Sequence, residues 1–407
     1  MFRHIIPVIF MCCSISANAQ FKNDNVLYKT VDPSELCDQL SRNKGYILLD
    51  VRSRGEHLDT SASLGYNLGH LKGAFNIDIR ELGNRLSELR TYTDKPVFVY
   101  CSHSQRSRRA SKILADSGFN KVFNINGGMT ALHYTGAIKK PCLQPLFESN
   151  NSYSLISASE LCEQWDKDKA LFILDVRSDS AFRHISLNAK ENAYGFIRGS
   201  VNIPLEELNS RLPAIPKENE IIVTDIYGEG AAGAAKILKK NGYKKVSVLI
   251  EGIDRILLTD EQLLKCKKSF YVSPVTYQLI NVTEFGRFAK LNKDYLLLDI
   301  RSADEVANKH KDSWRNIGNL KNAVNIPLNE LDSRIGEIEK FKHREVVIYG
   351  FSSSPEVFDA AFKLQQQGFS SIRVIIGGLF NLRWTAANTK GNSYLASLVT
   401  KIPEENR

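Results

Sequence analysis

Apolar and polar positions along the chain repeat in three long blocks. In each block a short apolar run ends in Asp-Val-Arg-Ser or Asp-Ile-Arg-Ser. The runs are YILLDVRS at 46–53, LFILDVRS at 171–178 and YLLLDIRS at 295–302. Continuous apolar runs of this length, bounded by polar turns, are typical of strands that are buried on both faces of a parallel sheet.

The segments around each run repeat as well. Upstream, a capping residue is followed three positions later by glutamate, which predicts a helix start; the pairs are Asp32 and Glu35, Ser157 and Glu160, and Asn281 and Glu284. Downstream come a glycine-initiated motif (GHLKGAFNI, GFIRGSVNI or GNLKNAVNI), a second apolar strand (VFVYC, IIVTD or VVIYG), a helix and a last strand. This alternation predicts an α/β fold with three tandem domains, each a small parallel β-sheet with helices on both faces.

The repeats also set the expected domain boundaries. We expect domains at 27–145, 152–270 and 277–392, followed by a C-terminal tail at 393–407. The linkers should lie around 140–153 and 265–278, which contain Pro, Ser and Asn.

Residues 1–19 have the pattern of a removable export signal. Arg3 and His4 precede an apolar stretch from Ile5 to Cys13, and an A-x-A cleavage site follows at 17–19. The apolar stretch is too short to span a bilayer, and no later segment reaches the roughly 18 apolar residues that a span needs. We therefore expect an exported chain, in a bacterial periplasm or outside the cell, where conditions are oxidising.

Composition and charge exclude some classes of partner. Hydrophobic residues make up 43% of the chain and charged residues 24%, so each block can bury a core. The net charge of +9 is spread thinly, without a basic run or a basic stripe interleaved with aromatic residues. This pattern indicates a solvated surface and argues against a nucleic-acid partner.

The loop after the strand VFVYC carries the candidate chemistry, because open α/β sheets bind ligands at the carboxyl ends of their strands. It reads CSHSQRS from Cys101 to Ser107 and leads into a helix. A cysteine at this place faces backbone N–H groups and a helix N-terminus, and Arg106 adds a formal cation. Such a setting favours a thiolate or a persulfide anion over the neutral thiol.

The pattern C-x4-R between a strand and a helix, with D-V-R and GH-x-x-GA-x-NI upstream and GG downstream, resembles the rhodanese family. The resemblance covers all three repeats in fold and the first in active-site chemistry. It implies that Cys101 takes the outer sulfur of a donor such as thiosulfate and forms a persulfide. The sulfur then passes to a nucleophilic acceptor such as a thiol, cyanide or a protein.

The resemblance also assigns roles within the loop. Cys101 is the nucleophile, and Arg106 stabilises the bound anion. The residues expected to contact the substrate are Ser102, His103, Ser104, Gln105 and Ser107. No cofactor is implied, and no Cys/His spacing supports a metal site.

Two alternatives stay open. Related phosphatases and arsenate reductases have arginine six positions after the cysteine, where this chain has Ser107, so the spacing favours sulfur over phosphate. The second alternative is a noncatalytic binding or scaffold protein. Many family loops have glycine where this chain has Ser104, and a left-handed serine would cost about 1 kcal/mol or more in strain.

The equivalent loops of the other two repeats have lost the nucleophile. Asp225 stands in the place of Cys101 in the second repeat, and Gly350 does so in the third. Alignment from the preceding strand puts Pro355 opposite Arg106. We therefore expect both domains to be structural or recognition modules.

The remaining cysteines follow the repeats. Cys37 and Cys162 occupy equivalent helix positions, and Cys142 and Cys266 follow equivalent domain ends. The third repeat has Gly286 at the first position and no later cysteine, so both members are missing together. This joint presence and absence predicts two disulfides, Cys37–Cys142 and Cys162–Cys266, although buried apolar thiols remain an alternative.

Three further features carry weaker signals. Asp50 and Arg52 recur in the repeats without a nucleophile, so a structural role is expected for them and for the nearby Glu56. His70 is expected to order a turn rather than shuttle a proton. The segment 58–67 is longer than in single-domain relatives and should either overhang the site or build a domain contact.

Overall fold

The computed structural model describes residues 27–165, 167 and 171–403. The expected export signal at 1–19 lies outside this part of the chain. Within the described residues, no helix combines the length and apolar character needed to cross a membrane.

The first domain contains a five-stranded parallel sheet in the order β1-β6-β5-β2-β4. Its strands are β1 (Lys29–Val31), β2 (Ile47–Asp50), β4 (Phe75–Asn76), β5 (Val97–Tyr100) and β6 (Val122–Ile125). Its helices are α1 (Leu36–Arg42), α2 (Arg54–His57), α3 (Leu82–Arg85), α4 (Gln105–Asp116) and α5 (Gly128–Tyr134). A small antiparallel pair, β3 (His70–Leu71) with β7 (Phe147–Glu148), closes the domain.

The second domain has the same strand arrangement, in the order β11-β9-β12-β13-β8. The strands are β8 (Ser154–Ile156), β9 (Phe172–Asp175), β11 (Val201–Asn202), β12 (Ile221–Thr224) and β13 (Val246–Leu249). The helices are α6 (Ala158–Trp165), α7 (Asp179–Phe182), α8 (Ala189–Ala193), α9 (Leu208–Arg211), α10 (Glu229–Lys240), α11 (Gly252–Leu258) and α12 (Lys267–Phe270). Its closing pair is β10 (Phe196–Ile197) with β14 (Tyr271–Val272).

The third domain repeats the plan in the order β15-β20-β19-β16-β18. The strands are β15 (Gln278–Ile280), β16 (Tyr295–Asp299), β18 (Val324–Asn325), β19 (Glu345–Tyr349) and β20 (Ser371–Ile375). The helices are α13 (Val282–Leu291), α14 (Ala303–Val306), α15 (Leu331–Arg334), α16 (Pro355–Gln366) and α17 (Gly378–Asn388). Its closing pair is β17 (Asn319–Leu320) with β21 (Val399–Thr400).

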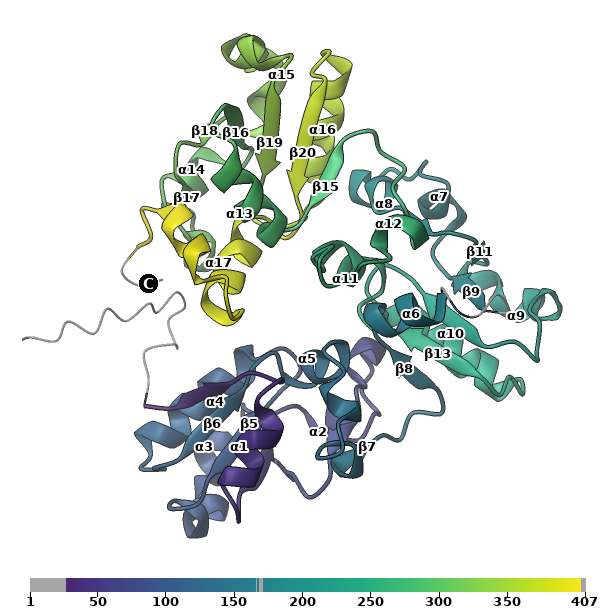
Figure 1. Cartoon of the computed structure of the whole chain (residues 1–407), viewed down its shortest axis with the longest axis vertical. Coiled ribbons are helices and arrows are strands. Elements are labelled where there is room, and N and C mark those ends of the chain that lie inside the picture. The colour runs from purple at the N-terminus through teal and green to yellow at the C-terminus, as the bar shows by residue number, and fades with distance from the viewer. Residues whose placement is uncertain (1–26, 166, 168–170, 404–407) are drawn as a thin grey trace, which may run out of the picture.

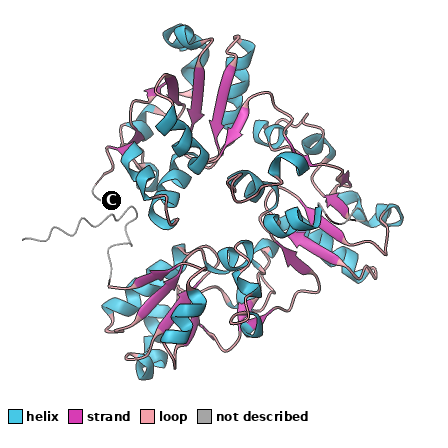
Figure 2. Ribbon diagram, in the orientation of Figure 1, coloured by secondary structure: helices cyan, strands magenta, loops and turns pink. Residues whose placement is uncertain are grey.

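The expected α/β fold with three tandem domains is therefore confirmed, and Figure 2 shows helices flanking the strands of each domain. Figure 1 shows the domains grouped around a common centre, with α5, α11 and α17 on its inner side. Each of these helices follows the last strand of its sheet. The loops at the carboxyl ends of the central strands consequently lie where the domains approach one another.

The structure moves the expected domain ends outwards. The limits at 145, 270 and 392 each fall short of a returning strand, which is β7, β14 or β21. The segment 393–400 is therefore part of the third domain and not a tail. Its 3-10 helix, η10 (Ser393–Leu398), buries Leu395 against the domain core.

The capping boxes expected at the first helices form in two of the three domains. They occur in the second and third domains, at Ser157 with Glu160 and at Asn281 with Glu284. In the first domain the expectation is wrong, because Asp32 accepts bonds from the amide and hydroxyl of Ser34 and closes a local turn. The helix α1 consequently begins only at Leu36.

A buried ion pair at the end of the first central strand is common to the three domains. In the first domain the Arg52 Nη2 donates to Asp50 at 2.7 Å and to the carbonyl of Gly69 at 2.7 Å, and both charged side chains are fully buried. The corresponding pairs, each also bonded to a glycine carbonyl, are Asp175 with Arg177 and Asp299 with Arg301. The expected structural role of the Asp-Arg signature agrees with this geometry.

The pKa of Asp50 follows from its surroundings. Burial opposes ionisation, but Arg52 and a hydrogen bond from His57 lower the pKa of Asp50 from 3.8 to about 2. Since the folded pKa lies below the unfolded one, the pair stabilises the domain fully above about pH 4 and loses that contribution as pH falls towards about 2.

The four cysteines that the repeats pair are adjacent in the structure. Cys37 in α1 is joined to Cys142, and Cys162 in α6 is joined to Cys266, with Cα atoms 5.8 Å apart in each pair. Each bridge tethers the end of a domain to its first helix.

The third domain fills the same place with apolar packing. A Cβ atom added at Gly286 in α13 would lie 2.5 Å from a methyl carbon of Leu395 and 2.6 Å from the hydroxyl of Tyr394. The C-terminal segment thus packs directly on the first helix, at the position where the other two domains have a cysteine.

Replacing Asp50 with alanine is expected to destabilise the first domain by about 3–5 kcal/mol, because it leaves Arg52 buried without its carboxylate. Hydrogen exchange of the β2 and β5 amides measures the loss locally. The matched control is Asp78→Ala, whose partner Arg80 is 79% exposed, and it should leave this exchange unchanged. Equal protection in Asp50→Ala and wild type would contradict the prediction.

Peptide mapping of the non-reduced protein is expected to recover the two bridged pairs and to leave Cys101 as the free thiol among the cysteines of residues 27–403. Closing loops of about 100 residues should stabilise each domain by up to about 4–5 kcal/mol in the chain-entropy model. Alkylation of Cys37, Cys142, Cys162 and Cys266 in the unfolded, non-reduced chain would reject both bridges.

Candidate active site

Cys101 lies at the carboxyl end of β5, next to the strand that ends in Asp50. It is 1% exposed, and among the described residues it is the free cysteine. Its carbonyl accepts the amide of Met129 at 2.8 Å, which ties the loop to the start of α5. A Cβ atom at Gly128 would lie 2.1 Å from this carbonyl, so the close approach requires glycine.

Ser104 has a left-handed conformation, with φ of 80°. The sequence analysis raised this possibility because many loops of the family it resembles have glycine at this position. Gly228 occupies the equivalent place in the second domain, with φ of 90°. The strain at Ser104 is offset by its hydroxyl, which accepts the amide of Gly127. Serine is therefore compatible with the loop geometry at this position.

Arg106 is held at the loop by the carboxylate of Glu56, which the sequence analysis grouped with Asp50 and Arg52. Its two outer nitrogens donate to the two oxygens of Glu56, both at 2.6 Å, and one also donates to the hydroxyl of Ser102 at 2.9 Å. Burial raises the pKa of Glu56, but the bonds from Arg106 and Ser53 together with the charge of Arg106 outweigh it and lower the pKa overall. Glu56 is thus a partner of the site arginine and not of the Asp50–Arg52 pair.

Two of the predicted substrate contacts, Ser107 and Gln105, differ in their exposure to solvent. Ser107 is fully buried, and its hydroxyl donates to Asn124 at 2.6 Å and to the carbonyl of Ser104 at 3.1 Å, so it braces the loop from behind. This placement corrects its expected role as a substrate contact. Gln105 is exposed at the first position of α4.

His103 faces the second domain. Its Nε2 lies 2.8 Å from Oε1 of Glu251 and 3.2 Å from the hydroxyl of Thr130. The ring of Tyr66 packs edge-on against the imidazole, with centroids 6.0 Å apart. The sequence signal for this contact was a glutamate in the place of the first glycine of the repeated Gly-Gly pair.

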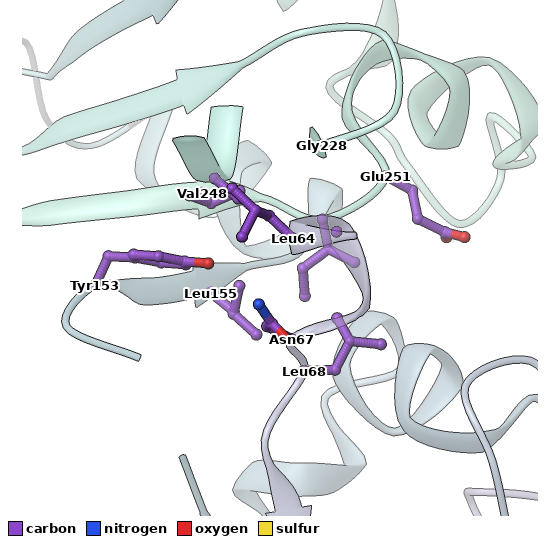
Figure 3. A pocket seen from close by; sticks show the side chains of 11 residues that line it. Leu64, Asn67, Leu68, Tyr153, Leu155, Gly228, Val248 and Glu251 are labelled. Carbon is purple, nitrogen blue, oxygen red and sulfur yellow. The ribbon is translucent and has the colours of Figure 1, made fainter. Parts of the chain in front are cut away.

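The long segment 58–67 both overhangs the site and builds a domain contact, the two roles between which the sequence could not decide. Tyr66 overhangs the loop beside His103, while the amides of Leu64 and Gly65 donate to the Glu229 carboxylate of the second domain, both at 2.8 Å. Figure 3 shows Leu64 among residues of both domains, beside a cavity of about 10 Å³, the room of a single water. The first domain is therefore docked on the start of α10.

The third domain approaches the same region from its own inner helix. The Asn126 side chain, next to Gly127, donates to the carbonyl of Asn388 at 2.5 Å. The guanidinium of Arg108 lies 5.6 Å from the ring centre of Trp384. The cysteine loop is thus bordered by both other domains.

His70 has contacts outside the cysteine loop. Its Nε2 lies 3.5 Å from Glu148 in the returning strand β7, and its ring lies 4.2 Å from that of His57. Burial lowers the pKa of His70. These contacts agree with a role in ordering the chain at β3.

In the second domain the loop holds an anion of its own. The Asp225 carboxylate accepts the amides of Gly228, Gly230 at 2.6 Å and Ala231 at 3.2 Å. Burial raises the pKa of Asp225, and these amides oppose that effect. A side-chain carboxylate therefore occupies the amide cradle, and Gly230 stands where the first domain has Arg106.

The third loop is one residue longer before its helix, because α16 begins at Pro355 whereas α4 begins at Gln105. The second helical residue, which is Arg106 in the first domain, is consequently Glu356 and not Pro355 in the third. Gly350 supplies no side chain at the start of this loop. Neither nucleophile nor cation is present at the corresponding positions.

Comparison with known proteins agrees with the repeated fold. A family model described as "Rhodanese-like domain" matches residues 32–134, 157–258 and 287–384. An uncharacterized protein of Bacillus subtilis is 32% identical over 128 residues, which cover 31% of this chain and 90% of that protein. The thiosulfate sulfurtransferase GlpE of Shewanella oneidensis is 28% identical over 99 residues, covering 24% of this chain and 87% of that protein.

Among solved structures, a thiosulfate sulfurtransferase from Pseudomonas aeruginosa is 16% identical, with a TM-score of 0.23. The match covers 85% of this chain and 66% of that one.

Replacing Asp225 with alanine is expected to destabilise the second domain by about 1–3 kcal/mol or more, because amides that the carboxylate satisfies lose their acceptor. An added anion should then occupy the cradle. We expect sulfate to raise the unfolding temperature of Asp225→Ala more than that of wild type. The control Asp179→Ala, which removes an exposed carboxylate, should respond to sulfate as wild type does; an equal response in all three would contradict the prediction.

Proposed function

The chain belongs to the rhodanese-like family, and on that premise we propose that it is a sulfurtransferase that carries sulfur as a persulfide on Cys101. The observation that carries the proposal is the contrast among three equivalent loops. Cys101 begins the first, a carboxylate fills the second, and glycine begins the third. The first loop alone has a nucleophile at this position.

The proposed reaction has two displacements. The Cys101 thiolate attacks the outer sulfur of a donor such as thiosulfate, the sulfur–sulfur bond of the donor breaks, and sulfite leaves with the bonding pair. An acceptor nucleophile then attacks the outer sulfur of the persulfide and releases the Cys101 thiolate. Backbone amides at the start of α4 and the charge of Arg106 favour the anionic sulfur in both steps.

The contacts of Arg106 support sulfur rather than phosphate chemistry. Both outer nitrogens are engaged by Glu56, so they are not free to hold a phosphoryl group within the loop during its transfer, whereas thiosulfate needs to bring only its outer sulfur to Cys101. The loop also reaches its helix four positions after Cys101 and places arginine at the fifth. These features fit a compact monoanion such as a persulfide.

We further propose that the chain acts after export, in an oxidising compartment. The proposal is supported by the pattern of residues 1–19 and by the adjacent cysteine pairs. The second and third domains are then noncatalytic partners of the first. A thiol of a small molecule or of a protein is the proposed physiological acceptor.

Intact mass spectrometry after incubation with thiosulfate tests the proposed function. Wild type is expected to gain one sulfur atom per chain and to lose it to cyanide, while Cys101→Ser gains none. Arg106→Gln should slow the gain by roughly 100-fold, because a charge that stabilises the developing anion is missing. Thermal unfolding of each variant confirms that it is folded.

Two outcomes would contradict the proposal. Wild type that takes up no sulfur and turns over no donor would favour a noncatalytic recognition protein. Sulfur that is taken up equally by Cys101→Ser would place the chemistry elsewhere in the chain.

A further inference from the structure

The second domain reaches the active-site loop of the first through one carboxylate. Glu251 lies directly before α11, and its Oε1 is 2.8 Å from Nε2 of His103, two residues after Cys101. The Glu251 side chain is 24% exposed. A residue of a domain without a nucleophile thus contacts the loop that carries one.

Glu251 has a left-handed backbone conformation, which residues with a side chain such as glutamate rarely adopt. Its φ is 55°, whereas glycine takes the equivalent position in the other two domains, as Gly127 with φ of 70° and Gly377 with φ of 84°. A left-handed residue with a long side chain costs about 1–3 kcal/mol, and such strain persists where the surrounding structure enforces it. The strain is retained here at a contact beside the proposed nucleophile.

The charge of Glu251 determines which ring nitrogen of His103 carries hydrogen. Burial opposes ionisation of Glu251, but the charge of Arg255 and the bond from His103 lower its pKa to about 2. Arg255 binds the second carboxylate oxygen through its Nε at 2.6 Å. Because an ionised carboxylate only accepts hydrogen bonds, Nε2 of His103 must carry hydrogen.

The other ring nitrogen is the one available for chemistry. Within the described part of the chain, no hydrogen bond is formed by Nδ1 of His103. In the neutral ring with hydrogen on Nε2, Nδ1 holds a lone pair and accepts a proton. The imidazole is also 41% exposed, so a substrate at the mouth of the loop can reach it.

We propose that Glu251 is a positioning residue that holds His103 so that Nδ1 takes the proton of a thiol acceptor; this inference rests on the proposed persulfide chemistry. In this step the S–H proton passes to Nδ1, and the acceptor sulfur bonds to the outer sulfur of the persulfide. The bond from that sulfur to Cys101 breaks, and its electron pair stays on Cys101 as a thiolate. The acceptor leaves as a persulfide, and no external oxidant or reductant takes part.

The choice of acceptor separates this role from a merely structural one. The full-length protein is loaded with thiosulfate, freed of excess donor, and mixed in mildly alkaline buffer with an alkyl thiol or with sulfite. The thiol stays largely protonated and must lose a proton, whereas sulfite attacks as an anion. Loss of sulfur from the chain is followed by intact mass.

We expect Glu251→Gln to slow transfer to the thiol roughly tenfold, less than the roughly 100-fold or more that loss of a general base costs because His103 is still present, and to leave transfer to sulfite unchanged. His103→Asn should slow the thiol reaction as well. The double variant should be no slower than His103→Asn alone, since Glu251 acts through His103. The matched control is Glu229→Gln, which loosens another contact between these domains and should leave both acceptors unaffected.

The outcomes that overturn the inference are distinct from those that overturn the proposed function. Equal slowing with both acceptors in Glu251→Gln would assign Glu251 to domain docking, and unchanged rates with both would remove any role for it. Additive effects in the double variant would separate Glu251 from His103. A wild-type chain that forms no persulfide would overturn the proposed function and this inference with it.

Discussion

The buried ion pair at the end of the first central strand is the interaction on which each domain's loop region depends. In the first domain Arg52 joins Asp50 to the glycine that opens the GH motif, and its guanidinium lies 5.8 Å from the ring centre of Tyr100, the residue before Cys101. The Tyr100 hydroxyl accepts the amide of Leu71. One pair thus connects two neighbouring strands and the segment that begins at Gly69. The bonds on several sides of the carboxylate and guanidinium offset part of the desolvation cost of the pair.

On this shared frame, the three loops differ in how their backbone amides are used. An amide cradle at a helix N-terminus favours negative charge whatever its source. In the proposed function the first domain offers that field to the sulfur of Cys101, whereas the second satisfies it with Asp225. The third lengthens the loop and places Glu356 at the second helical position. The second domain therefore keeps the frame, with a side-chain carboxylate at the position where the first domain has Cys101.

The repeats made the fold, the position of Cys101 and the cysteine pairs predictable, because these properties depend on local patterns that occur two or three times. The contacts of Glu56 with Arg106 and of Glu251 with His103 were missed, since no local pattern specifies which distant residue meets a side chain. Ser107 was misplaced because spacing within a loop does not tell which way a side chain points. The closing strands were missed for a related reason, as two-residue strands have no periodicity to recognise.

One of the contacts that sequence reasoning missed places a residue of the second domain beside the cysteine loop of the first. The cysteine loop contains a left-handed serine, and the second domain contributes a left-handed glutamate to the same region. Isolated residues in this conformation relax unless neighbouring structure holds them. Here Ser104 is held within its own domain, while Glu251 is held between Arg255 and His103 across the interface. The geometry beside Cys101 is therefore a property of the assembled chain, and the first domain alone would lack the carboxylate that orders its histidine.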